Sequence, residues 1–457
     1  MRKLFRLLYV LVWSFGVVSS FAAAKVIMLA APKGSNPAGS YARVQKGTDY
    51  SKGVAAWKAQ NHLTTTTNQR LVREKAGVGG GFGRPGYKNG TMDTVPYFNS
   101  WFITGGRNSV YTYSMVGKSP KAGGTTLIEN RILPLFIALL DERGNALYSF
   151  DPTGSFLCGA GSDVNLTVQS PLYDASTTYP GGAGLPADTG QLVDTNQRAE
   201  FHNVRTADWH TLLNVPQNGE CAVSIYGVGL DPSAWAYLID KNNDIVGEAV
   251  DINVMAVVFE EMLIAESASV GLPNHVVPIL LTDAIAAYDS ISGSCCALGF
   301  HSAQQGFINT AGILVWAWAS FLPANNNIWA PLADIAVVSH EVTELFNNPF
   351  VNTNVAPWVD GAVLFAQGNL ETADVIEAMN ANDVIYPVTL NTPSNGVYTY
   401  HPQNEALLGW FTRTPLEGGA YSWPNTQTLG QCQHVPSATP NWCYGEGSAG
   451  FFFGPPY

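Results

Sequence analysis

Between about residues 91 and 230, short runs of apolar, β-branched and aromatic residues alternate with turn-forming residues. Such runs are typical of β-strands, because branched and aromatic side chains pack well on a pleated surface. Short strands separated by regular turns favour an antiparallel sandwich. The pattern therefore predicts a β-sandwich-like domain over residues 91–235, with strands at 110–116, 132–140, 164–169 and 221–228.

The pattern changes after Pro232. Apolar residues recur at helix-like intervals over 254–266, whereas 276–281 and 313–321 are continuous apolar runs of the length of buried strands. This mixture predicts an α/β domain over residues 236–390. The chain as a whole is then an α+β protein, with a sandwich-like N-terminal region followed by the α/β domain.

A further helix is predicted within residues 331–349. At 100° per residue, Ile335, Val338, Val342 and Leu345 fall on one apolar stripe, and His340 lies almost opposite. The helix should end before Pro349, because the residue preceding a proline is pushed out of the α region. The apolar stripe would pack on the domain, and the polar face would look into a cleft.

The polar face carries the main candidate chemistry. His340 and Glu344 are four residues apart, so they share one helix face about 6 Å apart and could bind one metal ion. Glu341 follows the histidine directly and could act on water held by that ion. The frame resembles the H-E-x-x-H motif of zincin metallopeptidases, with glutamate in place of the second histidine.

Residues further along the chain extend the resemblance. In the gluzincin metallopeptidases a later helix supplies a glutamate ligand, and an aspartate shortly after it orients the first histidine. Glu371 and Asp374 resemble that pair. The resemblance implies a zincin-like domain in which His340, Glu344 and Glu371 bind the metal, Glu341 is the general base and Asp374 supports His340. Asp360 is the alternative third ligand.

A second resemblance covers residues 334–374. The order H-E-x-x-E, then Asn348-Pro349, Trp358 and an E-x-x-D block is similar to plant secreted phosphate-induced (exordium-like) proteins and to uncharacterised secreted bacterial proteins. In the plant proteins the last block continues with L-C, whereas Val375 and Ile376 stand here, so any disulfide at that point is lost. The resemblance implies a shared site and no particular reaction.

The ligand chemistry bears on which metal binds. Zn²⁺ is the first expectation for one divalent ion at a zincin-like motif. A set of two carboxylates and one histidine also suits the harder ions Mn²⁺ and Ca²⁺. Two carboxylates reduce the net charge at the metal, so they weaken activation of water more than they weaken metal binding. The alternative is that no metal binds. In that case the five side chains are solvated surface residues, namely His340, Glu341, Glu344, Glu371 and Asp374.

The N-terminus predicts export. A basic start at residues 2–6, an apolar run over 7–18 and Ala22-Ala23-Ala24 form a secretory signal peptide over residues 1–24. We expect a secreted protein, extracellular or periplasmic, with no membrane span after cleavage. A Gly/Asn/Thr-rich segment follows over 25–90, and a turn-rich region with cysteines occupies 391–457.

The composition limits the partners. Only 13% of residues are charged and the net charge is −12, which argues against nucleic acid, since phosphate binding needs clustered Lys and Arg. We expect an extracellular protein, peptide or cell-surface glycan as partner. The leading hypothesis is a metallopeptidase-like hydrolase, and the alternative is a non-enzymatic, carbohydrate-binding or other cell-surface protein with a structural metal or none.

Cysteines and the remaining histidines leave other options. The 6 cysteines of a secreted chain favour disulfides, with Cys432–Cys443 the simplest pair. A nucleophilic Cys296 next to His301 is an alternative use. His275, His301 and His401 could reach the predicted cleft in the folded chain.

Overall fold

The structure is a computed structural model that describes the following parts of the chain. These are residues 26–29, 93–103, 110–154, 157–216, 224–239, 245–289, 294–305, 312–324, 329, 331–360, 365–379, 383–413, 419–430, 433–434 and 443–444. The predicted signal peptide and Cys432 lie outside these ranges, so the signal and the Cys432–Cys443 pair stay predictions.

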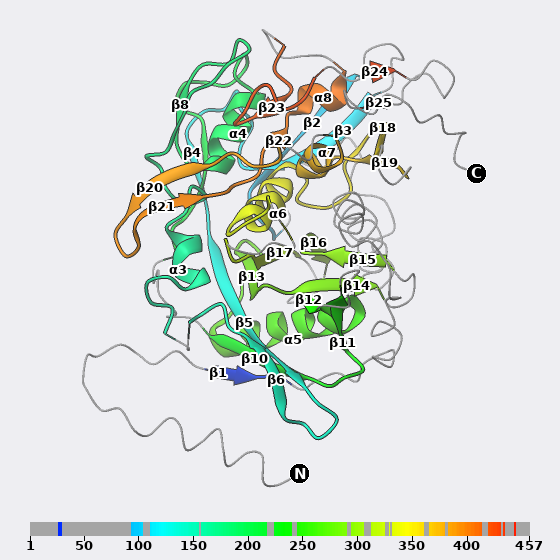
Figure 1. Ribbon diagram of the computed structural model, residues 1–457. Helices are drawn as coiled ribbons and strands as arrows, with labels where there is room; N and C mark the ends of the chain where they lie inside the picture. The colour runs from blue at the N-terminus through cyan, green and yellow to red at the C-terminus, as the bar shows by residue number, and fades with distance from the viewer. Residues whose placement is uncertain are drawn as a thin grey trace.

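A mixed seven-stranded sheet is the centre of the molecule (Figure 1). Five of its strands, β1, β10, β5, β13 and β17, lie next to one another in that order and pair in parallel. Strand β16 pairs antiparallel with β17 at one edge of the sheet. Strand β6 pairs antiparallel with β5. In spatial order the strands are β1 (Val26–Met28), β10 (Ile225–Leu230), β5 (Asn130–Leu140), β13 (Val277–Asp283), β17 (Ile313–Phe321) and β16 (Gly299–Gln305), with β6 at Ala146–Phe150.

Helices cover both faces of this sheet. Alternate residues of β17 point to opposite sides, so Trp316 and Trp318 pack in the core beneath α5 (Ile252–Val270), whereas Ala317 and Ala319 pack in the core beneath α6 (Ala336–Asn347). The small alanine side chains allow the α6 backbone to approach the sheet closely. Burial on both faces explains why β17 is apolar along its whole length.

Smaller sheets and further helices surround the central layers. The four-stranded sheets are β11 (Trp235–Ile239), β12 (Ile245–Asp251), β14 (Ala286–Asp289) and β15 (Ser294–Ala297), and β19 (Phe365–Asn369), β18 (Asn354–Asp360), β25 (Cys443–Tyr444) and β24 (Gln433–His434). The two-stranded pairs are β2 (Tyr97–Ile103) with β3 (Val110–Val116), β4 (Thr125–Ile128) with β9 (His210–Leu213), β7 (Thr178–Tyr179) with β8 (Asp188–Thr189), β20 (Val388–Thr392) with β21 (Gly396–Tyr400), and β22 (Glu405–Ala406) with β23 (Ser422–Trp423). The other helices are α3 (Asp163–Val168), α4 (Leu192–Glu200), α7 (Thr372–Met379) and α8 (Leu408–Thr412).

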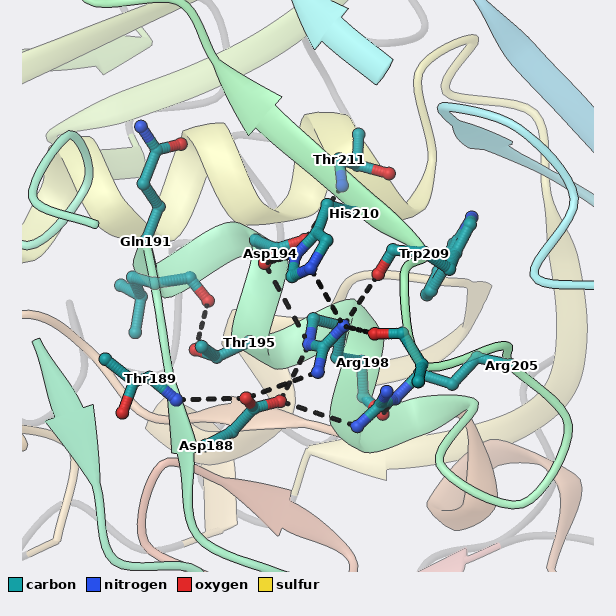
Figure 2. A network of polar contacts seen from close by, with 12 residues as sticks. Asp188, Thr189, Gln191, Asp194, Thr195, Arg198, Arg205, Trp209, His210 and Thr211 are labelled. Carbon is teal, nitrogen blue, oxygen red and sulfur yellow. Dashed lines mark hydrogen bonds and ion pairs between the residues drawn. The ribbon is translucent and has the colours of Figure 1, made fainter. Parts of the chain in front are cut away.

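A network of polar contacts fixes α4, which in turn packs on α6. Figure 2 shows Arg198 of α4 reaching Asp188 at 2.8 Å and the carbonyl oxygen of Trp209 at 2.7 Å. The Asp194 carboxylate lies 2.8 Å from His210 Nδ1 and also accepts the Thr211 N–H. These contacts tie the helix to β8 and β9, so His210 has a structural role.

The structure confirms a mixed α/β protein rich in strands. The predicted elements at 110–116, 132–140, 254–266, 276–281 and 313–321 correspond to β3, β5, α5, β13 and β17. Strand 164–169 was a wrong prediction, since those residues fall in α3 and the residue that follows it. Ser162 caps that helix by accepting the Asn165 N–H, which satisfies a donor that a helix start would otherwise leave unpaired.

Strand pairing crosses the boundary expected at residue 235. Strand β5 pairs in parallel with β10 on one side and with β13 on the other, and only its C-terminal part forms an antiparallel pair, with β6. Its residues are buried on both faces of the sheet, which is the usual environment of parallel strands. The division into a sandwich-like and a zincin-like domain stays a prediction.

Helix α6 differs from the prediction in its surroundings. The expected apolar stripe does pack in the core, but all 12 residues of the helix are buried, including its polar face. The polar face lies against β16 and α7. None of the helices in the described part of the chain combines the length and hydrophobicity that crossing a bilayer requires.

The packing of α6 predicts a large effect of truncating its buried leucine. Leu345 is 0% exposed, so Leu345→Ala should lower the free energy of unfolding by about 2–5 kcal/mol, measured by urea denaturation. The matched control is Leu127→Ala on β4, where the leucine is 58% exposed and the change should stay within about 0.5 kcal/mol. Equal effects of the two substitutions would contradict this packing.

Candidate metal centre

Three elements bring the candidate residues together. Helix α6 carries His340, Glu341 and Glu344, and both strand β16 and helix α7 pack against it (Figure 1). Glu371 immediately precedes α7, and Asp374 is in its first turn. Residues far apart in the sequence therefore meet at one buried place.

The separations around His340 fit metal coordination. Its Nε2 atom lies 3.4 Å from Glu344 Oε2, 3.5 Å from Asp374 Oδ1 and 3.9 Å from Glu341 Oε1. Ligands held at about 2.1 Å in a tetrahedral zinc site lie roughly 3.4 Å from one another. The distances are therefore those expected between atoms that share an ion, and longer than normal hydrogen bonds.

His301 is the residue that the motif alone did not assign to the centre. Its Nδ1 atom lies 3.6 Å from both Glu341 Oε2 and Glu344 Oε2, and its Nε2 atom lies 3.8 Å from Glu371 Oε2. Its side chain is 0% exposed, and neither ring nitrogen has a hydrogen-bond partner within the described residues. The second histidine that H-E-x-x-E lacks on α6 thus comes from β16.

A glycine allows β16 to run so close to α6. A Cβ atom at Gly299 would lie 2.7 Å from Glu341 Cγ and 2.8 Å from the carbonyl oxygen of Trp318. Gly299 and His301 are two residues apart, so they face the same side of the strand. The Gly-Phe-His sequence at residues 299–301 is the local signal that could have directed attention to His301.

Donor atoms of these residues form two groups able to hold a metal ion. One group is His301, Glu344 and Glu371, and the other is His340, Glu341 and Glu344; within each, the donor atoms all lie within 4.8 Å of one another. Glu344 belongs to both. The predicted set of His340, Glu344 and Glu371 is thus divided between two groups that share a carboxylate.

The electrostatics of the centre call for a cation. Burial alone would lower the pKa of His340, but the neighbouring carboxylates of Glu344 and Glu341 raise it well above its usual value. Burial raises the pKa of Glu341 to about 7, although the nearby histidines oppose the shift. Burial likewise raises the pKa of Glu405 well above its usual range. A proton or a metal ion must therefore compensate the buried negative charge.

Gln403 fixes the ring of His340. Its Oε1 atom lies 3.1 Å from His340 Nδ1, while its Nε2 donates to the carbonyl oxygen of Ala373 at 3.0 Å. Because an acceptor lies at Nδ1, the favoured tautomer of the His340 ring carries its hydrogen on Nδ1. The lone pair of Nε2 is then available to a metal. Glu377 Oε1 also lies 3.4 Å from Nδ1. No local pattern in the sequence pointed to Gln403, because it lies far beyond the motif.

An ion pair joins the segment just before Gln403 to the start of α6. Asp334 precedes α6 with a φ of 40°, and its carboxylate accepts the N–H groups of Ile335 at 2.6 Å and His401 at 2.9 Å. The other carboxylate oxygen lies 2.7 Å from His401 Nδ1. His401 was a candidate for the predicted cleft. It lies two residues before Gln403 in the sequence and contacts Asp334 at the start of α6.

The remaining sequence candidates lie elsewhere. His275 is 49% exposed and its nearest carboxylate is Glu129 at 3.8 Å. Asp360 is the last residue of β18, and its role as an alternative ligand stays a prediction. The described part of the chain contains no free cysteine, so it offers no support for Cys296 as a nucleophile beside His301.

No protein-family model, curated protein or solved structure matches this chain. The similarity to gluzincins and to exordium-like proteins therefore stays a prediction based on the motifs.

Gln403 should strengthen metal binding. Gln403→Leu removes the acceptor at His340 Nδ1, so the dissociation constant for a divalent metal should rise about 10–100-fold, measured by competition with a chromophoric chelator. The control is Gln427→Leu, which removes an exposed glutamine and should leave the constant unchanged. Equal affinities of the Gln403 variant and the unmodified protein would rule out this role.

The pair of His401 and Asp334 should make stability depend on pH. The hydrogen bond to Asp334 raises the pKa of His401 although partial burial opposes the shift. Its stabilisation is therefore fully present below the pKa of an unfolded histidine and is lost as the pH rises through the higher folded-state pKa. The melting temperature should fall more on His401→Gln at about pH 5.5 than at about pH 8.5.

The half-exposed His275 provides the control for that measurement. His275→Gln removes a histidine whose nearest carboxylate is itself exposed, so only a small change in melting temperature is expected. A loss on His401→Gln that is the same at both pH values would show that the ion pair does not contribute.

Proposed function

We propose that this chain is a metal-dependent hydrolase related in mechanism to zincin metallopeptidases. The observation that carries the proposal is the position of His301, whose buried ring faces Glu341, Glu344 and Glu371. The motif on α6 alone supplies one histidine and two carboxylates. The ring from β16 adds a second neutral donor, which preserves more of the positive charge that activates water.

The residues fit a divalent ion by their chemistry. His301, His340, Glu344 and Glu371 would hold it, since imidazole nitrogen and carboxylate oxygen are ligands of zinc. When bound, a divalent ion polarises a carbonyl group and lowers the pKa of a coordinated water. Zn²⁺ is our first choice, with Mn²⁺ favoured next by the many carboxylates, and Ca²⁺ made less suitable by the two histidines.

Glu341 is the proposed general base. Its two carboxylate oxygens face different histidines, with Oε2 at 3.6 Å from His301 Nδ1 and Oε1 at 3.9 Å from His340 Nε2. A carboxylate between the donors can accept a proton from the attacking water and then pass it to the leaving amine.

The sequence supports a location and a class of substrate for this activity. The signal-like N-terminus and the low content of charged residues support a secreted enzyme, extracellular or periplasmic. We propose a peptide bond of an extracellular protein or peptide as the substrate. A zincin-like arrangement of the α/β part of the chain belongs to the same proposal.

The burial of the centre favours a second candidate function. The side chains of His301, His340, Glu344 and Glu371 are 0–3% exposed. A bound ion enclosed to that degree would stabilise the fold in the manner of a structural metal. The chain would then be a secreted binding protein, with a cell-surface glycan or protein as its partner.

Replacing the general base separates these two candidates. Glu341→Gln should lower the rate of peptide hydrolysis about 10²–10⁴-fold, because proton transfer contributes that much, while the bound metal is retained. The measurements are turnover of a quenched-fluorescent peptide library and metal content by elemental mass spectrometry. Glu260→Gln, which changes an exposed glutamate of α5, should alter neither quantity.

His340→Ala completes the experiment. The loss of a ligand should abolish both metal binding and hydrolysis. If the unmodified protein holds metal but Glu341→Gln leaves the hydrolytic rate unchanged, the mechanism fails. Metal that raises the melting temperature without any turnover on the library would support the structural site.

A further inference from the structure

We propose that the centre binds two divalent ions rather than one, with Glu344 as the shared ligand. The proposal rests on the proposed metal site and concerns the number of ions bound there. One ion would be held by His340 and Asp374 together with Glu344, and the other by His301 and Glu371 together with Glu344.

The histidines support separate ions. His340 Nε2 faces Glu344 Oε2 at 3.4 Å and Asp374 Oδ1 at 3.5 Å. His301 forms its own group of donors with Glu344 and Glu371. Both ring nitrogens of the buried His301 lack a hydrogen-bond partner in the described part of the chain, so a cation is the natural occupant beside that ring.

Glu344 is suited to bridge the two positions. Its Oε1 atom accepts the backbone N–H groups of Ala373 at 3.0 Å and Asp374 at 3.2 Å, which fixes the orientation of the carboxylate. Its Oε2 atom has no hydrogen-bond partner among the residues that the structure describes, and it lies 3.6 Å from His301 Nδ1 and 3.4 Å from His340 Nε2. One oxygen bonded at about 2.1 Å to each ion allows the separation of roughly 3.5–4 Å found in two-metal sites.

The charge of the surroundings also favours a second ion. Within the described ranges, six buried carboxylates lie in or next to the centre, those of Glu341, Glu344, Glu371, Asp374, Glu377 and Glu405. When ionised they contribute −6, whereas one divalent ion contributes +2 and two contribute +4. Because uncompensated buried charge is costly, the second ion would remove a large part of the remaining imbalance.

Mn²⁺ loading of the purified protein tests this proposal. After treatment with a chelator, the protein is equilibrated with excess Mn²⁺, freed of unbound metal and measured by elemental mass spectrometry and electron paramagnetic resonance. We expect two ions per chain and the spectrum of a magnetically coupled pair. Glu371→Gln, which alters only the His301 side, should bind one ion per chain and give the six-line spectrum of an isolated Mn²⁺.

The exposed Glu260→Gln serves as the control and should keep two coupled ions. The measurement on the unmodified protein decides the matter even if Glu371→Gln does not fold. Saturation at one uncoupled ion would overturn the two-ion centre and leave the proposed hydrolase intact. Two ions retained in folded Glu371→Gln would overturn the assignment of the second position, and no bound metal at all would overturn both proposals.

Discussion

The interaction on which the structure most depends is the compensation of buried negative charge between β16, α6 and α7. Glu341, Glu344 and Glu371 are removed from water together with two histidines. Burial of unpaired carboxylates is among the most unfavourable terms in folding, so such a cluster persists only when protons or cations compensate its charge. Without a metal, protonation of His340 would supply part of that charge, because its pKa is raised by the neighbouring carboxylates, and a divalent ion bound in its place would supply more.

The scaffold holds this cluster rigidly. Alternate side chains of β17 fill cores on both faces of the sheet, and its alanines bring α6 close enough for its polar face to reach β16. Gly299 removes the side chain that would otherwise collide with Glu341. Gln403 contacts the Nδ1 atom of the His340 ring, and the pair of Asp334 and His401 joins the segment before Gln403 to the start of α6. Donor geometry is thus set by tightly packed secondary structure, which reduces the reorganisation needed when a metal binds.

Local patterns predicted the parts of this site that depend on one element. The helical spacing of His340 and Glu344, and the chain stop before Pro349, are properties of a single helix and appear in α6 as expected. His301 and Gln403 could not be assigned in the same way, because strand pairing and packing between distant segments bring them to α6. The same limitation explains why β5 was expected in a separate sandwich: its apolar composition reveals a buried strand but not which strands it pairs with. Helix α3 shows a different error. Its β-branched residues were interpreted as a strand, whereas the Ser162 side chain caps a helix there.

Metal content of the protein as purified, without added metal, tests the central claim most directly. Elemental mass spectrometry should find Zn²⁺ or Mn²⁺ at one or more ions per chain, and His301→Ala should lose much of it, since this ring is buried against the proposed ligands Glu344 and Glu371 and the proposed base Glu341. That result would connect the charge of the cluster with an ion bound at β16 and α6. A purified protein that contains no metal, and that takes up no Zn²⁺, Mn²⁺ or Ca²⁺ when these are supplied, would contradict the account and leave protons as the compensating charge.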